Sequence, residues 1–162
     1  MESKVKIKAA VVTISDTRKP DNDVSGDRLC ELLNVFGAEI AEKRIVTDDT
    51  REISECMREL AGSGSVDLIL TTGGTGFAPR DNTPEATKAV IDREAPGIAE
   101  AMRRETAGKT PLAILSRGVA GIAGKTLIIN LPGSPKAVEE CFEVLRPVLR
   151  HAVRIVAGNT SH

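Results

Sequence analysis

The stretch VDLILTTGGTG (66–76) joins a short apolar run to a group of glycines. Its first part, 66–72, is almost continuously apolar, which is typical of a strand buried on both faces of a sheet. In its second part, Gly73, Gly74 and Gly76 allow backbone N–H groups to approach an oxyanion closely, and Thr75 adds a hydroxyl donor. The spacing matches neither the P-loop nor the dinucleotide-binding glycine pattern. It predicts a buried strand followed either by an anion-holding loop or by a tight turn that binds nothing.

Strands and helices alternate on both sides of this stretch. Apolar runs predict further strands at 7–15, 39–46 (an edge strand, from its polar alternation), 112–116 and 126–131. Periodic apolar residues predict a helix over 24–36 that ends at Gly37 as its C-cap. Helix-starting residues predict four more: after a cap at 49–52, from 83–85 with Thr83 as the N-cap, over 98–106 after a break at 95–97, and after a cap at 132–135. The connection 117–125 is expected to be small and flexible. The alternation predicts an α/β protein with three layers, α/β/α, around a mostly parallel sheet. We expect one domain over 1–162, with a frayed tail at 158–162.

The composition excludes several classes of protein. The 162 residues are 41% hydrophobic and 28% charged, as in globular domains. A formal net charge of −1 is too small for a strong nucleic-acid footprint, and no apolar run approaches the roughly 18 residues of a membrane span. Three widely spaced cysteines without C-x-x-C spacing predict a reduced, cytoplasmic protein. We therefore expect no nucleic-acid or membrane partner.

The rare residue types limit the chemistry. The chain has no Trp or Tyr and three Phe, so platforms for stacking bases are scarce. Its two histidines, His151 and His162, lie within the last twelve residues, which leaves little for a histidine base or a zinc site. Any reaction must rely on carboxylates, hydroxyls, lysines, backbone amides and a hard metal.

Polar residues follow each predicted strand, at the edge where open parallel sheets bind ligands. Asp48 and Asp81 are candidate Mg²⁺ carboxylates, although a surface acid and a turn residue explain them equally simply. The segment 132–136 (PGSPK) predicts either an anion site at a helix N-terminus, with Lys136 nearby, or a helix cap without a ligand. Other charged residues have simpler explanations: Asp16 is expected in a solvated loop, and Arg103 on a solvated helix face.

Five segments in the same order carry a resemblance to a known family. They are VVTISD (11–16), DVSG (23–26), TTGGTGFAPRDNTPEA (71–86), SRGVAGI (116–122) and NLPGSPKA (130–137). Together they resemble the MoaB/MogA family of molybdenum-cofactor biosynthesis proteins. The resemblance implies a molybdopterin-binding fold that adenylylates molybdopterin with Mg²⁺ and ATP and releases pyrophosphate. It also implies a homotrimer or a dimer of trimers, and transfer of the product to a molybdenum-insertion protein.

The resemblance also implies roles for individual residues. Asp48 and Asp81 match the family's catalytic, metal-binding acids. The positions that match its substrate- and nucleotide-binding rim are Ser15, Asp23, Ser25, Gly26, Thr72, Gly73, Gly74, Thr75, Gly76, Ser116, Asn130, Pro132, Gly133, Ser134 and Lys136. Thr47 departs from the pattern, because many relatives have proline before the acid, so Asp49 remains the alternative to Asp48.

The implied reaction agrees with the residues present. The terminal phosphate of molybdopterin is already an anion at neutral pH, so its attack needs no strong general base, and positioning and charge stabilisation suffice. Two other functions remain open at this point. One is a carrier that binds molybdopterin without catalysis, and the other is hydrolysis of a nucleotide diphosphate linkage by a protein of the same fold.

Overall fold

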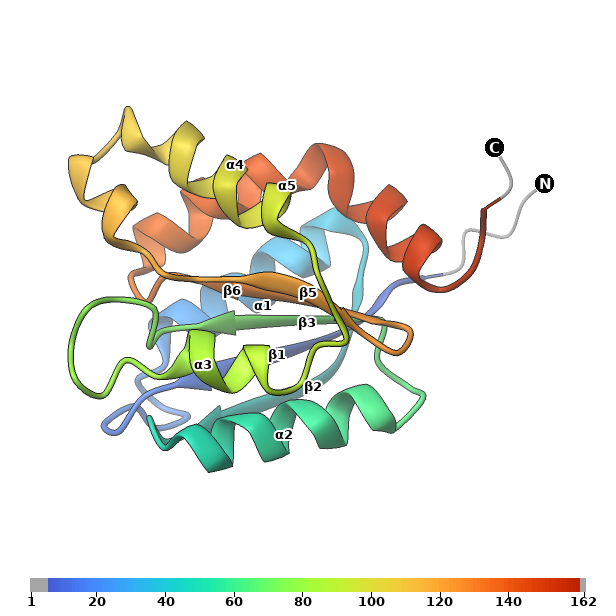
Figure 1. The fold of residues 1–162 in the computed structure, drawn as a ribbon, viewed down its shortest axis with the longest axis horizontal. Helices are drawn as coiled ribbons and strands as arrows, with labels where there is room; N and C mark the ends of the chain where they lie inside the picture. The colour runs from blue at the N-terminus through green and yellow to red at the C-terminus, as the bar shows by residue number, and fades with distance from the viewer. Residues whose placement is uncertain (1–5, 161–162) are drawn as a thin grey trace.

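A computed structural model describes residues 6–160 as a six-stranded sheet with helices on both faces (Figure 1). The strands are β1 (Lys8–Ile14), β2 (Glu39–Val46), β3 (Leu68–Thr72), β4 (Arg93–Glu94), β5 (Ala120–Ala123) and β6 (Thr126–Leu131), in the spatial order β2-β1-β3-β6-β5-β4. The helices are α1 (Val24–Phe36), α2 (Thr50–Gly62), α3 (Thr83–Lys88), α4 (Pro96–Ala107) and α5 (Pro135–Val156), with a 3₁₀ helix η1 (Pro111–Leu115). The predicted three-layer α/β/α fold is confirmed.

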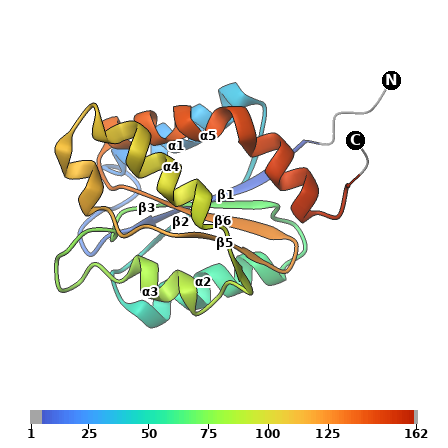
Figure 2. The same ribbon diagram turned by 45° about the horizontal axis from the view of Figure 1, so that its top comes forward.

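The helices divide between the two faces of the sheet. Helices α1, α4 and α5 cover one face, and α2 and α3 cover the other (Figure 2). Alternate residues of the central strands lie in the two hydrophobic cores, one on each face of the sheet. Leu70 lies in the same core as Phe142 of α5, whereas Ile69 lies in the same core as Met57 of α2. Strand β3 is buried along its whole length, as its continuous apolar run predicts.

The sheet is parallel in its first four strands and antiparallel at its far end. Strand β1 pairs in parallel with β2 and β3, and β3 pairs in parallel with β6. Strand β5 then runs antiparallel to both β6 and β4. The mostly parallel sheet and the edge position of β2 are therefore as predicted, but the strand at 120–123 lies in a segment that was expected to be a flexible connection.

The strand predicted at 112–116 is wrong, because this segment forms η1. Pro111 opens the turn, and the Thr110 hydroxyl oxygen accepts a hydrogen bond from the Leu112 amide at 3.3 Å. Leu112 and Ile114 are 69% and 67% exposed, so the apolar run LAILS does not enter the sheet. An apolar run of five residues is too short to separate a buried strand from an exposed turn.

Two helix starts also differ from expectation. Helix α3 begins with Thr83 as its first residue and Asn82 as its N-cap, and the Thr83 hydroxyl instead donates to the carbonyl oxygen of Gly73 at 2.9 Å. The segment 95–97 does not interrupt a helix but opens α4 at Pro96, because α3 has already ended at Lys88 and β4 lies between them.

Three helix caps form as the sequence predicts. The Asp49 carboxylate accepts from the Glu52 amide at the start of α2, and the Ser134 hydroxyl accepts from the Ala137 amide at the start of α5. Gly37 ends α1 with a φ of +96°, a left-handed conformation that favours glycine.

No helix between residues 6 and 160 is long and apolar enough to span a bilayer. Of the predicted frayed tail, residues 161–162 lie outside the described residues, whereas the Gly158 and Asn159 amides donate to the Ile155 and Arg154 carbonyls that end α5.

Candidate functional site

A cavity of about 590 Å³ opens at the carboxyl ends of β3 and β6. The glycine loop and the loop before α5 form its floor, and α4 and η1 form its wall. Nine predicted site residues line it: Gly74, Thr75, Gly76, Asp81, Ser116, Asn130, Pro132, Gly133 and Ser134. The structure thus brings together residues that lie 60 positions apart in the sequence, at the edge where a parallel sheet is expected to bind its ligand.

The glycine loop requires glycine at two positions for steric reasons. Gly73 has a φ of +100°, and a Cβ there would lie 2.5 Å from the Ile14 carbonyl oxygen. Gly74 has a φ of +68°, and a Cβ there would overlap the Thr83 hydroxyl. The Thr72 hydroxyl donates to the Pro132 carbonyl at 2.7 Å, which joins this loop to the one before α5. The loop is therefore a tight turn that also lines the cavity, and its role in holding an anion stays a prediction.

Arg117 holds the outer half of the glycine loop. Its Nε donates to the Gly76 carbonyl at 2.8 Å, its Nη2 donates to the Asp81 carbonyl at 2.6 Å, and its Nη1 pairs with Glu85. The hydrogen bond from Arg117 lowers the pKa of Glu85. Arg117 lies in the segment SRGVAGI, but its spacing gives no sign of this role, because all three partners are more than 30 residues away.

Asp48 and Asp81 lie near each other on separate loops. The Asn82 side-chain amide donates to the Asp48 carbonyl at 3.0 Å, which ties the two loops together. One carboxylate oxygen of Asp48 accepts from the Asp16 amide at 2.9 Å, and one of Asp81 accepts from the Ala78 amide at 2.9 Å. Burial, followed by the charge of Asp16, raises the pKa of Asp48, and the charge of Asp81 adds to the same effect.

These two carboxylates suit a hard cation. Mg²⁺ is usually held by one or two carboxylates, with substrate phosphates and water completing its coordination. Within residues 6–160 no three His, Cys, Asp or Glu side chains gather closely enough to hold a metal on their own. In the described part of the chain, only one oxygen of each carboxylate accepts from a backbone amide, so the other oxygens of Asp48 and Asp81 fit Mg²⁺ bound together with phosphates.

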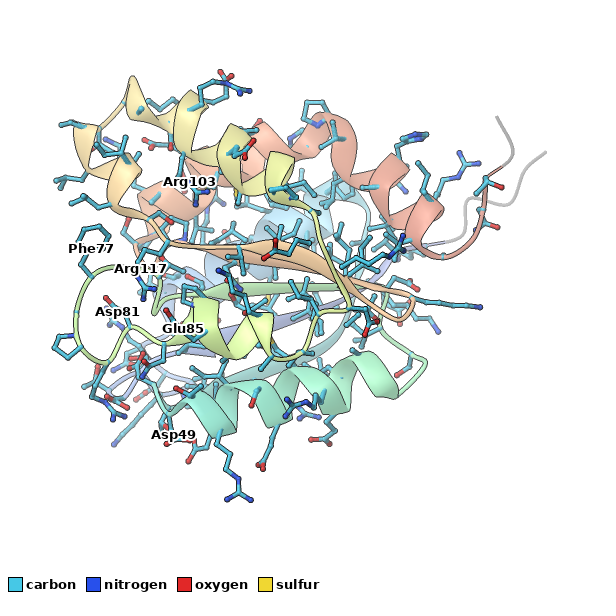
Figure 3. All side chains as sticks on the ribbon, in the orientation of Figure 1. Asp49, Phe77, Asp81, Glu85, Arg103 and Arg117 are labelled. Carbon is cyan, nitrogen blue, oxygen red and sulfur yellow. The ribbon has the colours of Figure 1, made fainter. Side chains whose placement is uncertain are left out.

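Asp49 is a poorer candidate than Asp48. Its carboxylate accepts a hydrogen bond from the Glu52 amide at 3.0 Å and is engaged as the cap of α2. Figure 3 places Asp49 beside the start of α2, whereas Asp81 and Arg117 lie at the glycine loop. The geometry favours Asp48 as the functional acid, and this assignment stays a prediction.

Arg103 lines the cavity, contrary to the expectation of a solvated helix face. Its Nη1 donates to the carbonyl oxygens of Ser116 and Gly118 at 3.2 and 2.8 Å, from the inner side of α4. A single arginine on a helix gives no sign in the sequence of which way it points.

Phe77 lines the outer part of the cavity and is 68% exposed (Figure 3).

Three predicted binding residues are engaged inside the protein. Asp23 is 1% exposed and accepts hydrogen bonds from the Thr13 hydroxyl and the Gly26 amide at 2.7 and 3.1 Å. Asn130 is 1% exposed and donates to the hydroxyls of Thr71 and Thr87 at 3.1 and 2.9 Å. Gly26 packs directly on the Asp23 carboxylate. Through these internal contacts, the three residues support the loops at the cavity rim.

The remaining predicted residues lie around the cavity rather than in it. The Ser25 hydroxyl donates to the Gly133 carbonyl at 2.6 Å and so joins α1 to the loop before α5. Lys136 has a side chain that is 84% exposed, with its Nζ 4.0 Å from Glu140. Ser15 lines a second cavity of about 550 Å³ beside the ends of β1 and β2.

Replacing Gly26 by alanine is expected to lower the free energy of unfolding by about 3 kcal/mol, because overpacking and loss of a helix cap add together. The new Cβ would overlap Asp23 and lie 2.5 Å from the Thr13 hydroxyl. Urea unfolding would measure the change. Gly62→Ala is the control, since no atom lies within 4 Å of its Cβ position and alanine favours a helix. Equal stabilities for the two variants would contradict the packing argument.

Comparison with known proteins places this chain among molybdopterin-related proteins. A family described as "probable molybdopterin binding domain" matches residues 10–151. Molybdopterin adenylyltransferase of Helicobacter pylori strain J99 is 42% identical over 139 residues, covering 85% of this chain and 79% of that protein. Molybdenum cofactor synthesis protein cinnamon of Drosophila melanogaster is 44% identical over 93% of this chain, which spans only 26% of that longer protein.

Comparison with solved structures gives the same result. The molybdopterin biosynthesis enzyme MoaB of Thermus thermophilus superposes with a TM-score of 0.87 at 46% identity, covering 94% of this chain and 97% of that one. The likeness therefore extends over nearly the whole chain. The chain belongs to the MoaB/MogA family of molybdenum-cofactor biosynthesis proteins.

Proposed function

We propose that this chain adenylylates molybdopterin with ATP during molybdenum-cofactor biosynthesis. The observation that carries the proposal is the cavity at the sheet edge, which joins a glycine loop to Asp81 and lies close to Asp48. The Helicobacter pylori relative named molybdopterin adenylyltransferase matches this chain through both loops of the cavity, which supports the same reaction.

The cavity suits a flat, anionic substrate. Its volume lies within the range of about 300–1,000 Å³ that is usual for small-molecule sites. Ala99, Met102, Leu112 and Leu115 supply apolar surface for a ring, and the glycine loop and the start of α5 supply backbone amides for anions. Among the described residues that line it, Arg103 is the one lysine or arginine, and its charge favours an anion beside it, whereas Asp81 and Glu140 are negatively charged.

The reaction joins two phosphates. An oxygen of the molybdopterin phosphate forms a bond to the α-phosphorus of ATP, while the bond from that phosphorus to pyrophosphate breaks. Mg²⁺ bound with ATP supplies charge neutralisation on the phosphates. Asp48 and Asp81 would hold that cation, and the glycine loop would bind the anionic groups, while Arg117 keeps the loop in place. The attacking oxygen carries no proton at neutral pH, so none of these residues must act as a strong base.

The wider context follows from the same proposal. We expect a homotrimer or a dimer of trimers and transfer of the product to a molybdenum-insertion protein. We also expect a cytoplasmic location, where the unpaired thiols of Cys30, Cys56 and Cys141 stay reduced. Burial raises the pKa of each thiol, which keeps it protonated and unreactive.

Incubation of the purified chain with MgATP and molybdopterin is expected to yield adenylylated molybdopterin and pyrophosphate in equal amounts. Chromatography with detection of the pterin would measure the first product, and a coupled pyrophosphate assay the second. A carrier would bind molybdopterin in calorimetry yet form neither product. That result would overturn the enzymatic proposal and leave only binding.

A further inference from the structure

Asp16 lies where three loops meet, although the sequence predicted only a solvated loop residue. Its Oδ1 accepts hydrogen bonds from the Asp48 amide at 3.0 Å and from Arg80 Nη2 at 2.9 Å, and its Oδ2 accepts from Arg80 Nε at 2.6 Å. Its own amide donates to Asp48 Oδ2 at 2.9 Å. Asp16 and Asp48 are therefore joined by two reciprocal hydrogen bonds, and Arg80 binds both oxygens of Asp16 through Nε and Nη2, along one edge of its guanidinium.

These contacts connect the two acids that are proposed to hold Mg²⁺. On one side, the Asp16 amide occupies one carboxylate oxygen of Asp48 and so fixes the direction of the other. On the other side, Arg80 directly precedes Asp81, so the ion pair anchors the segment from which Asp81 projects. One side chain thus constrains both carboxylates, which come from loops 33 residues apart in the sequence.

Stability alone does not account for this arrangement. The side chains of Asp16 and Arg80 are 39% and 60% exposed, and ion pairs between exposed side chains contribute little to folding. The pair instead has a defined geometry, because an arginine fork on a carboxylate fixes orientation as well as distance. Three hydrogen bonds reach the Asp16 carboxylate, two of them from Arg80 and one from the Asp48 amide.

Charge adds a second argument. Asp16, Asp48 and Asp81 carry like charges on neighbouring loops, and the Asp16 amide and the Asn82 side chain tie these loops together. Arg80 neutralises Asp16, which leaves Asp48 and Asp81 as the carboxylates with an oxygen free to bind a cation. Because Arg80 occupies its carboxylate, Asp16 does not act as a ligand itself, and it orients the carboxylates of Asp48 and Asp81 instead.

We propose that Asp16 is a positioning residue that orients Asp48 directly, and Asp81 through Arg80, for binding the Mg²⁺ of MgATP. The proposal rests on the function proposed above, in which Asp48 and Asp81 hold that cation. In metal sites, residues that orient the ligands typically contribute about 10–100-fold to metal affinity.

The test compares Asp16→Ala with Asp21→Ala, which removes an exposed acid from the same loop. Mn²⁺ replaces Mg²⁺, and free Mn²⁺ is measured by electron paramagnetic resonance in the presence of ATP without molybdopterin, so no turnover is needed. We expect Asp16→Ala to weaken Mn²⁺ binding at least about tenfold and Asp21→Ala to leave it unchanged. Asp16→Asn should fall between them, because its amide oxygen can still accept from the Asp48 amide.

A double-mutant cycle tests the route through Arg80. If Asp16 acts partly through Arg80, then Arg80→Ala should weaken Mn²⁺ binding in the wild type but add little to Asp16→Ala. Equal affinities for Asp16→Ala and Asp21→Ala would overturn the inference, and fully additive losses would overturn the route through Arg80. Product formation by the wild type is measured separately. If the wild type forms no product but still binds Mn²⁺ in a way that depends on Asp16, the proposed reaction is contradicted and the positioning role of Asp16 is retained.

Discussion

Asp81→Asn is expected to slow the formation of adenylylated molybdopterin about 10²-fold or more, the usual effect of losing one preorganised electrostatic group. Asparagine keeps an oxygen that can accept from the Ala78 amide, so the loop retains its shape and only the charge is lost. Molybdopterin affinity should change little. Rates at saturating Mg²⁺, with calorimetry for the pterin, would measure both quantities.

Asp48→Asn and Asp49→Asn provide matched comparisons for this variant. Asp48→Asn should also be slow and should weaken the dependence of ATP binding on Mg²⁺. Asp49→Asn should stay close to the wild type, because asparagine caps a helix as well as aspartate and preserves the contact to the Glu52 amide. Near-normal turnover of Asp81→Asn would count against a metal role, and a strong defect in Asp49→Asn would shift the functional acid by one residue.

Asn130→Ala is expected to lower the free energy of unfolding by about 3 kcal/mol, because it leaves buried polar groups without partners. The Asn130 side chain accepts from the Val119 amide at 3.1 Å and donates to two threonine hydroxyls. One of these, Thr87, donates in turn to the Thr83 carbonyl at 2.8 Å, and Thr83 donates to Gly73. The network therefore runs from β6 through α3 to the glycine loop.

Urea unfolding would measure the loss, with Asn34→Ala as the control at an exposed position of α1. The control should change stability by less than about 0.5 kcal/mol, as surface substitutions usually do. A loss below about 1 kcal/mol for Asn130→Ala would indicate that water replaces the missing side chain. Asn130 would then be accessible from the cavity, as a binding residue must be.

Local patterns were sufficient for most of the fold. The continuous apolar runs at 66–72 and 126–131 predicted central strands, and Asp49, Ser134 and Gly37 predicted helix ends, because these signals act within a few residues. The run LAILS gave a wrong prediction of a strand, because a local pattern does not describe the surroundings of the segment. Its environment is set by α4 and by the cavity, which are distant in the sequence, and the run itself carries no sign that Leu112 and Ile114 stay exposed.

The site was predictable in its location but not in its connections. Strand ends and glycines identified the rim, and the family resemblance assigned the metal-binding role to Asp48 and Asp81. The partners of Asp16 lie 32 and 64 residues away, and those of Arg117 lie 32 to 41 residues away. Contacts of this kind depend on how strands are ordered across the sheet, which neither periodicity nor spacing specifies.

The strand order also affects the chain while it is being made. Strand β3 pairs with β6 on one side, but β6 lies far downstream of it in the sequence. At about 5–20 residues per second, a ribosome needs roughly 3–12 s to extend the chain from residue 73 to residue 131. During that interval the apolar β3 presents an open edge of backbone donors and acceptors, which is the kind of surface that recruits other chains. Aggregation during synthesis is therefore most favoured before residue 131 emerges, and a chaperone that covers β3 would be most effective in those seconds.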